Sequence, residues 1–223
     1  MTIPTAGKHP ELLDELIESC GLPLEQVVIV ETKPGVVLPP GVIRIQDFGP
    51  PNIQRWWNIG IEASVKAGAN AVAVLNDDIR INGETLFKLF GELKNTGATI
   101  ASPSRPKIAN KRHTRPLVPY TPRIWGCLWM LDTGSDLRPD ERYVWWYGDE
   151  DLDIRSRKNF NGVVNVDVYY EHYFAGEGTS QNPELQALTE IDAMTFQRDH
   201  ARLLTLSTWY RKLLFINRGA DPS

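Results

Sequence analysis

The sequence predicts an α/β fold in which a mostly parallel central sheet is flanked by helices on both faces. In the first half of the chain, short apolar runs alternate with longer segments whose apolar residues recur at helical spacing. The apolar runs are continuous, as expected for strands that are buried on both faces. A chain of 223 residues, 42% of them hydrophobic, is long enough to bury a sizeable core within one domain.

Most predicted elements of the first half have a recognisable start or stop. Pro10 opens a helix that ends at Gly21, and Asn52 can cap a helix that ends at Gly68. A third helix is expected at residues 83–94. Strands are expected at residues 2–4, 27–30, 42–45, 71–75 and 99–102. Strand–helix alternation of this kind places the strands parallel, with any ligand site beyond their carboxyl ends.

The second half is less regular. Residues 103–122 are rich in proline and basic side chains, which indicates a long loop. A strand at 123–131, a helix at 149–158 and a strand at 163–173 are expected to follow. The last strand alternates strictly, which predicts that one face is formed by Val164, Val166, Val168, Tyr170 and His172.

The C-terminal residues 181–223 are predicted to form a helical extension of a domain that spans residues 1–180. Helical structure is expected from Pro183 to about Asn217. This segment has too many apolar residues for a solvated tail. They must cover the domain itself, a second copy of the chain in a homo-oligomer, or a membrane surface.

Composition excludes several classes of protein. A formal net charge of -4 provides no overall field for nucleic acid. No apolar stretch approaches the length of a transmembrane segment, and the start MTIPTAGKHP does not have the pattern of a signal peptide. The two distant cysteines, Cys20 and Cys127, do not form a disulfide framework and are typical of a cytoplasmic protein.

Asp77 and Asp78 directly follow the predicted strand 71–75. Carboxylates at this position can bind a divalent cation together with substrate phosphates. The alternative is a turn in which Asp occupies its favoured positions.

Four acidic residues lie within five positions of the segment GDEDLD, at the start of the predicted helix 149–158. Acidic residues favour helix starts, so helix electrostatics alone is one interpretation. Crowded carboxylates also raise the pKa of at least one of them, which suits a general base.

His172, at the end of the alternating strand, is the third candidate. It is either structural or a ligand for a transition metal. Four of the seven tryptophans also lie between residues 125 and 146. They can fill the core or form flat aromatic faces for carbohydrate.

These segments, in their order along the chain, resemble the family 2 glycosyltransferases. The resemblance runs from about residue 2 to residue 174 and is closest to small rhamnosyltransferase-like members. It rests on NIGIEASVKAGA, VAVLNDDI, GDEDLDIRSRKN and VDVYYEH. It implies the GT-A fold, which is Rossmann-like, and an inverting transfer of a sugar from a nucleoside-diphosphate sugar to a hydroxyl of a protein, a glycan or a small molecule.

The resemblance also implies roles for individual residues. Asp78 and His172 would hold Mn²⁺ or Mg²⁺ against the diphosphate. Asp151 would be the catalytic base, with its neighbour Glu150 as the alternative. The nucleotide-binding positions implied by the resemblance are Pro4, Thr5, Glu31, Asn58 and Asp77.

The sequence departs from the family pattern at two places, and two other functions stay open. Asn76 occupies the first position of the family's DXD motif, and the second strand ends in VETKPG where the family more often has Asp-Asn-Gly-Ser. A nucleotidyltransferase shares similar architecture but normally has a glycine-rich basic loop after its first strand. A non-catalytic nucleotide-sugar or glycan-binding protein is the other alternative.

Overall fold

The computed structural model describes residues 1–104, 110–173 and 183–218, with side chains described as far as residue 211. Within these residues an eight-stranded central sheet has the order β3-β2-β1-β4-β8-β6-β9-β7. The strands are β1 (Thr2–Thr5), β2 (Val28–Glu31), β3 (Ile43–Gln46), β4 (Ala71–Leu75), β6 (Ile100–Pro103), β7 (Lys111–His113), β8 (Leu128–Asp132) and β9 (Val163–Val166).

The sheet has a parallel half and a mixed half. Strands β3, β2, β1 and β4 are mutually parallel. Strand β8 runs antiparallel to both of its neighbours, β4 and β6, whereas β9 pairs parallel with β6. The carboxyl ends of β1 and β4 therefore lie next to each other at one edge. The predicted α/β class is confirmed.

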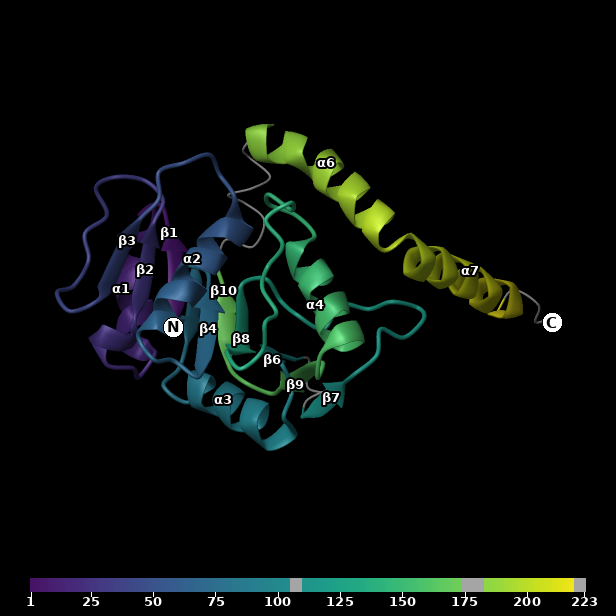
Figure 1. The fold of residues 1–223 in the computed structure, drawn as a ribbon, viewed down its shortest axis with the longest axis horizontal. Helices are drawn as coiled ribbons and strands as arrows, with labels where there is room; N and C mark the ends of the chain where they lie inside the picture. Colours follow the sequence, from purple (N-terminus) through teal and green to yellow (C-terminus); the bar gives the residue numbers. More distant parts are fainter. Residues whose placement is uncertain (105–109, 174–182, 219–223) are drawn as a thin grey trace.

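Four helices cover the two faces of the sheet (Figure 1). Leucines of α1 (Pro10–Ser19) and α3 (Thr85–Thr96) pack in one core cluster with Ile3 and Leu75. Side chains of α2 (Ile53–Lys66) and α4 (Gly148–Asn159) pack in a second cluster with Val72 and Val74. The alternation of β4 residues between the two clusters shows that this strand is buried on both faces.

Helix α2 begins and packs as its sequence indicates. The Asn52 side chain accepts a hydrogen bond from the Arg55 amide at 2.9 Å, which caps the helix. Gly60 faces β1 so closely that a Cβ atom there would lie 1.8 Å from Oγ1 of Thr2. Only glycine permits this approach of helix to strand.

The segment 163–173 departs from its prediction. It is not one alternating strand, because β9 ends at Val166 and all four of its residues are buried. A separate strand, β10 (Tyr170–His172), pairs antiparallel with β5 (Ile79–Ile81) in a two-stranded sheet. The alternating pattern in the sequence therefore spans two strands, β9, which is buried on both faces, and β10, which is partly exposed.

Two further predictions need correction. The loop predicted at 103–122 contains β7, which closes the edge of the sheet next to β9. The strand predicted at 123–131 is regular only from Leu128, with an isolated bridge between Trp125 and Leu128 before it.

The extension contains α6 (Pro183–Asp199) and α7 (Ala201–Arg218), which run away from the sheet along the side that carries α4 (Figure 1). The fully buried Asp192 anchors α6, because its carboxylate accepts hydrogen bonds from the backbone amides of Val144, Trp145 and Trp146 at 2.8–3.1 Å. Phe196 stacks on Tyr147 with ring centroids 5.1 Å apart. No helix among the described residues is long and apolar enough to cross a lipid bilayer.

Candidate functional site

Asp78 and His172 meet beyond the carboxyl end of β4. The turn Asn76–Asp78 leads from β4 into β5, and the pairing of β5 with β10 sets His172 opposite Ile79. Nε2 of His172 lies 3.1 Å from Oδ1 of Asp78, and the Tyr173 amide donates to the Asp78 carbonyl at 3.0 Å. Two residues 94 positions apart are thus joined by a small second sheet that sequence patterns did not predict.

Thr5 and Asp77 form a second contact at the same edge. The Thr5 hydroxyl donates to Oδ2 of Asp77 at 2.5 Å and accepts a hydrogen bond from the Gly7 amide at 3.0 Å. Burial raises the pKa of Asp77, and the neighbouring charge of Asp78 raises it further, while the Thr5 hydrogen bond opposes the shift. The contact exists because β1 and β4 are adjacent in the sheet, and it places Pro4, in β1, one residue away.

The environment of His172 favours a positive charge on the ring. The hydrogen bond to Asp78 raises the pKa of His172 to about 10, with a smaller contribution from Cys127 and against the effect of burial. This pKa favours the protonated ring of His172 at neutral pH. Because a metal ligand must be the neutral imidazole, a cation bound here would displace that proton.

The donor set fits a cation only in part. One carboxylate and one imidazole suit Mn²⁺. However, the described residues contain no group of three or more His, Cys, Asp or Glu side chains arranged to hold an ion. Diphosphate oxygens or water would have to supply the remaining ligands, as is common for such ions.

Asp151 is held inside an ion-pair cluster at the start of α4. It is 2% exposed, and its two oxygens contact Nε of Arg155 at 2.6 Å and Nε2 of His200 at 2.9 Å. His200 comes from the junction of α6 and α7. Both oxygens of the carboxylate predicted to be the base thus have partners within the protein.

Asp149 lies on another side of α4 from Asp151, and Glu150 lies between them. A Cβ atom at Gly126 would lie 3.1 Å from Oδ2 of Asp149. Burial raises the pKa of Glu150, and the charge and hydrogen bond of Asp149 raise it further. Asp149 is therefore close to residue 126, which directly precedes Cys127, the neighbour of His172.

Sequence reasoning missed Asp149 and Cys127. Helical phase offered a signal for Asp149, because residues two apart on a helix differ by about 200° in direction. Asp149 and Asp151 therefore point to nearly opposite sides. Nothing in the sequence indicated Cys127, a buried free thiol, as a neighbour of His172.

Glu31 and Asn58 bind other parts of the chain. Glu31 is fully buried and accepts hydrogen bonds from Arg44, Gln46 and the Val36 amide. Burial alone would raise the pKa of Glu31, but these partners hold it below its usual range. Asn58 donates to the Pro139 carbonyl at 3.0 Å and to Glu141 at 2.8 Å. Their nucleotide-binding roles stay predictions.

The tryptophans divide between the core and the site. Trp129 is fully buried and packs edge-on against Trp57, with ring centroids 5.6 Å apart. Trp146 donates from its indole to the Leu185 carbonyl at 3.2 Å. Trp125, in contrast, is 41% exposed and directly precedes Gly126, the residue next to Asp149.

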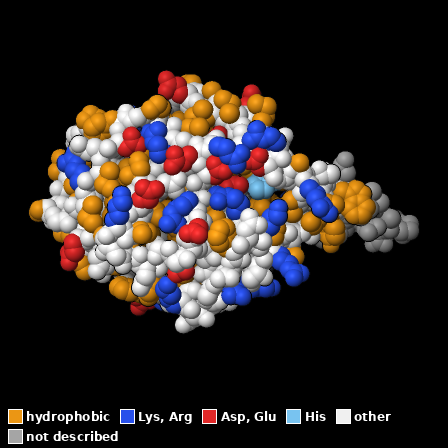
Figure 2. Space-filling view, in the orientation of Figure 1, with side chains coloured by type: hydrophobic (Ala, Val, Ile, Leu, Met, Phe, Trp, Pro, Cys, Tyr) orange, Lys and Arg blue, Asp and Glu red, His pale blue; other side chains and the backbone are white. Residues whose placement is uncertain are grey.

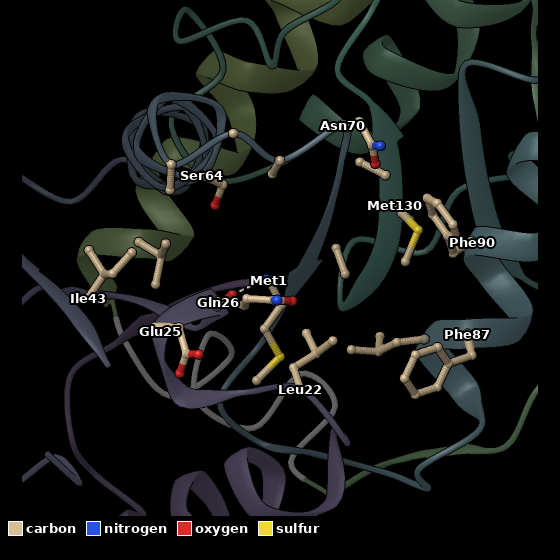
Figure 3. A pocket seen from close by; sticks show the side chains of 17 residues that line it. Met1, Leu22, Glu25, Gln26, Ile43, Ser64, Asn70, Phe87, Phe90 and Met130 are labelled. Carbon is tan, nitrogen blue, oxygen red and sulfur yellow. Dashed lines mark hydrogen bonds between the residues drawn. The ribbon is translucent and has the colours of Figure 1, made fainter. Parts of the chain in front are cut away.

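A cavity of about 380 Å³ opens at the opposite edge of the sheet (Figure 3). It lies at the amino ends of the strands, where Met1, Val28 and Ala71 line it. Phe87 and Phe90 of α3 form another part of the lining. The predicted site residues at the carboxyl ends do not line it.

The fold defines an α/β protein with an acidic and histidine-bearing site at the carboxyl edge of its parallel strands. No protein-family model matches the sequence, and no curated protein is similar to it in sequence. Solved structures do share its fold.

They include crystal structures of S. aureus TarS. A structure of TarS residues 1–349 aligns with a TM-score of 0.55 at 12% identity and covers 92% of this chain and 72% of that chain. The same TarS fragment with UDP aligns with a TM-score of 0.57 at 14% identity and covers 90% of this chain and 71% of that chain. Its complex with UDP-GlcNAc aligns with a TM-score of 0.54 at 15% identity and covers 92% of this chain and 73% of that chain. At this identity the likeness concerns the fold.

Proposed function

We propose that this protein is a nucleotide-sugar-dependent glycosyltransferase of the GT-A fold. The observation that carries the proposal is the contact of Asp78 with His172 beside the Thr5–Asp77 pair, at the edge where open α/β sheets bind ligands. The fold shared with TarS, whose crystal structures contain UDP and UDP-GlcNAc, supports it. So does the resemblance of the sequence segments to family 2 glycosyltransferases.

Asp78 and His172 would hold Mn²⁺ or Mg²⁺, which when bound neutralises the charge of a leaving nucleoside diphosphate. The hydrogen bond from Thr5 would hold the Asp77 carboxylate in one orientation at the carboxyl edge of the sheet before a ligand binds. Pro4 and Thr5 would form the floor of the nucleotide pocket because β1 ends there.

The general base would come from the start of α4. A base must reach the acceptor hydroxyl, either directly or through one water. Glu150 meets that requirement better than Asp151, because Arg155 and His200 occupy both oxygens of Asp151. Because the pKa of Glu150 is raised to about 9, only the ionised fraction of Glu150 can act as the base, and in that fraction its carboxylate is a stronger base than an ordinary one. A single displacement from the opposite side of the anomeric carbon would invert its configuration.

Trp125 would form part of the acceptor side. It is 41% exposed and lies next in the chain to Gly126, the neighbour of Asp149. A flat aromatic face at that place suits a sugar or another ring with apolar faces. The acceptor class is therefore a hydroxyl carried by a glycan or a glycosylated molecule.

Product analysis distinguishes this function from its alternatives. The protein is incubated with UDP-GlcNAc and other nucleotide sugars, including a rhamnosyl donor, in the presence of Mn²⁺. Slow release of nucleoside diphosphate is expected from donor hydrolysis without acceptor. Release of pyrophosphate from nucleoside triphosphate and sugar phosphate would instead indicate a nucleotidyltransferase.

The non-catalytic alternative also has a structural observation in its favour, the occupied oxygens of Asp151. A binding protein would retain nucleotide-sugar affinity and release no product with any donor. That outcome would contradict the proposed transfer.

A further inference from the structure

Basic residues are segregated into two segments of this acidic protein. Residues 103–123 and 201–218 together contain ten of the 24 Lys and Arg residues and none of the 28 Asp and Glu residues. The rest of the chain is therefore strongly acidic. Among the described residues, Arg115, Arg202 and Arg211 of these segments have exposed side chains near the place where the two segments meet.

The two segments meet in the fold at Tyr120. The Tyr120 amide donates to Oγ of Ser207 at 2.9 Å, and Arg211 donates to the Tyr120 carbonyl at 3.2 Å. Figure 1 shows the loop before Tyr120 reaching toward α7. We call the exposed side chains of residues 114–121 and of the first turns of α7 the basic face.

Large apolar side chains of the basic face are exposed beside its charges. Leu117 is 67% exposed and Trp209 is 60% exposed, and Leu206 and Tyr210 are also exposed. Arg202, Leu206, Trp209 and Tyr210 recur at helical spacing on one side of α7. Figure 2 shows hydrophobic side chains with basic ones beside them on the protruding end of the molecule.

This side of α7 is not the side that packs on the domain. Leu203 and Leu204 pack against the third core cluster, which contains Tyr120 and Phe196, and Ser207 is buried. The helix therefore has one side fixed to the protein and another, with Trp209, left facing outward. Tryptophan, tyrosine and arginine together are typical of helices that lie in a membrane interface.

We propose that the basic face docks on the surface of an anionic lipid bilayer. Its charge complements anionic headgroups, and Trp209, Leu206 and Leu117 would enter the boundary between headgroups and acyl chains. Docking lies in the plane of the surface, since no described helix can span a bilayer.

A second copy of the chain fits this face less well. A symmetric contact brings the same patch of both copies together. Here that would place arginines against arginines, with no acidic residue in either segment to compensate. An anionic partner avoids this repulsion, and a lipid surface also accepts the exposed apolar side chains.

Vesicle flotation of the full chain tests the proposal. The probes are phosphatidylcholine vesicles with about 30% phosphatidylserine and vesicles of phosphatidylcholine alone. Binding is expected only to the anionic vesicles and should weaken as salt is raised. Arg202→Gln should weaken vesicle binding about fivefold, because one basic residue near an anionic surface strengthens binding by about that factor. Trp209→Ala should weaken it without changing its salt dependence.

Matched controls lie on other surfaces. Lys66→Gln removes an exposed charge at the end of α2, and Phe48→Ala removes an aromatic side chain that is 50% exposed. Both should bind vesicles as the wild type does, and circular dichroism checks that every variant is folded. Three results would overturn the proposal: no flotation with anionic vesicles, control variants as damaging as Arg202→Gln, or a dimer in light scattering that Trp209→Ala dissociates.

Discussion

Nε2 of His200 lies 2.9 Å from Oδ1 of Asp151, and this contact joins the C-terminal helices to the start of α4. Arg155 contacts the other carboxylate oxygen at 2.6 Å, one helical turn along α4. With Asp192 and Phe196, the contact makes α6 part of the packed structure of the protein. Helix α4 therefore depends on residues beyond the segment that resembles glycosyltransferases.

Replacing His200 with alanine should lower the free energy of unfolding by about 1–3 kcal/mol, because the change leaves one oxygen of a buried carboxylate without its partner. Denaturant unfolding measures the difference. Arg198→Ala, two residues earlier on an exposed surface, should change stability by less than about 0.5 kcal/mol. Equal effects of the two substitutions would show that the His200 contact contributes nothing.

The glycine at position 60 should not tolerate a methyl group. Gly60→Ala places Cβ 1.8 Å from Oγ1 of Thr2, so α2 must move away from β1. We expect destabilisation of roughly 1–3 kcal/mol or more from this overpacking. Gly91→Ala in α3 is the matched control, because nothing lies within 4 Å of its Cβ position. That change should stabilise the protein by about 0.5–1 kcal/mol.

Stability should fall with rising pH through the titration of Glu150. The pKa of Glu150 is raised in the folded protein by burial and by Asp149, so the folded state binds more protons than the unfolded state above the usual Glu range. Under proton linkage, stability then decreases as pH rises through that window. Glu150→Gln should flatten this dependence in urea titrations from pH 5 to pH 9 (about two units either side of neutrality). The exposed Glu62→Gln should retain the wild-type slope.

The same glutamate should matter most for transfer. Glu150→Gln is expected to reduce the transfer rate by about a hundredfold to ten-thousandfold, as loss of a general base does, with donor affinity unchanged. Asp151→Asn should mainly lower the stability of the folded protein, because it removes the charge that pairs with Arg155. If Asp151→Asn abolishes transfer in a protein of normal stability while Glu150→Gln is active, Asp151 is the base. Activity in both variants would contradict a base in this cluster.

Local sequence patterns predict the fold well where an element is determined by residues that are close together in the sequence. The cap at Asn52, the stop at Gly68 and the buried run of β4 are features of neighbouring residues, and each was found where expected. The pairing of β10 with β5 depends on contacts between residues far apart in the sequence, so the local alternation up to His172 does not indicate where one strand ends and the next begins.

The candidate site could be predicted only in part. The family resemblance implies that Asp78 and His172 act together, and the structure brings them into contact. The burial of Asp151 could not be predicted, because His200 lies 49 residues away and outside the resemblance. Glu31 is a similar case, since its partners Arg44 and Gln46 come from the adjacent strand β3.

The most direct test of the proposed function is calorimetric titration of UDP into the protein with Mn²⁺ and with a chelator. We expect UDP binding that depends on the cation, and Asp78→Ala should remove that dependence because the Asp78 carboxylate would fix the ion against the diphosphate. The exposed Asp136→Ala should behave as the wild type. Equal UDP affinity with Mn²⁺ and with chelator, or a cation dependence that survives in Asp78→Ala, would contradict the assignment of this edge as a metal-dependent nucleotide-sugar site.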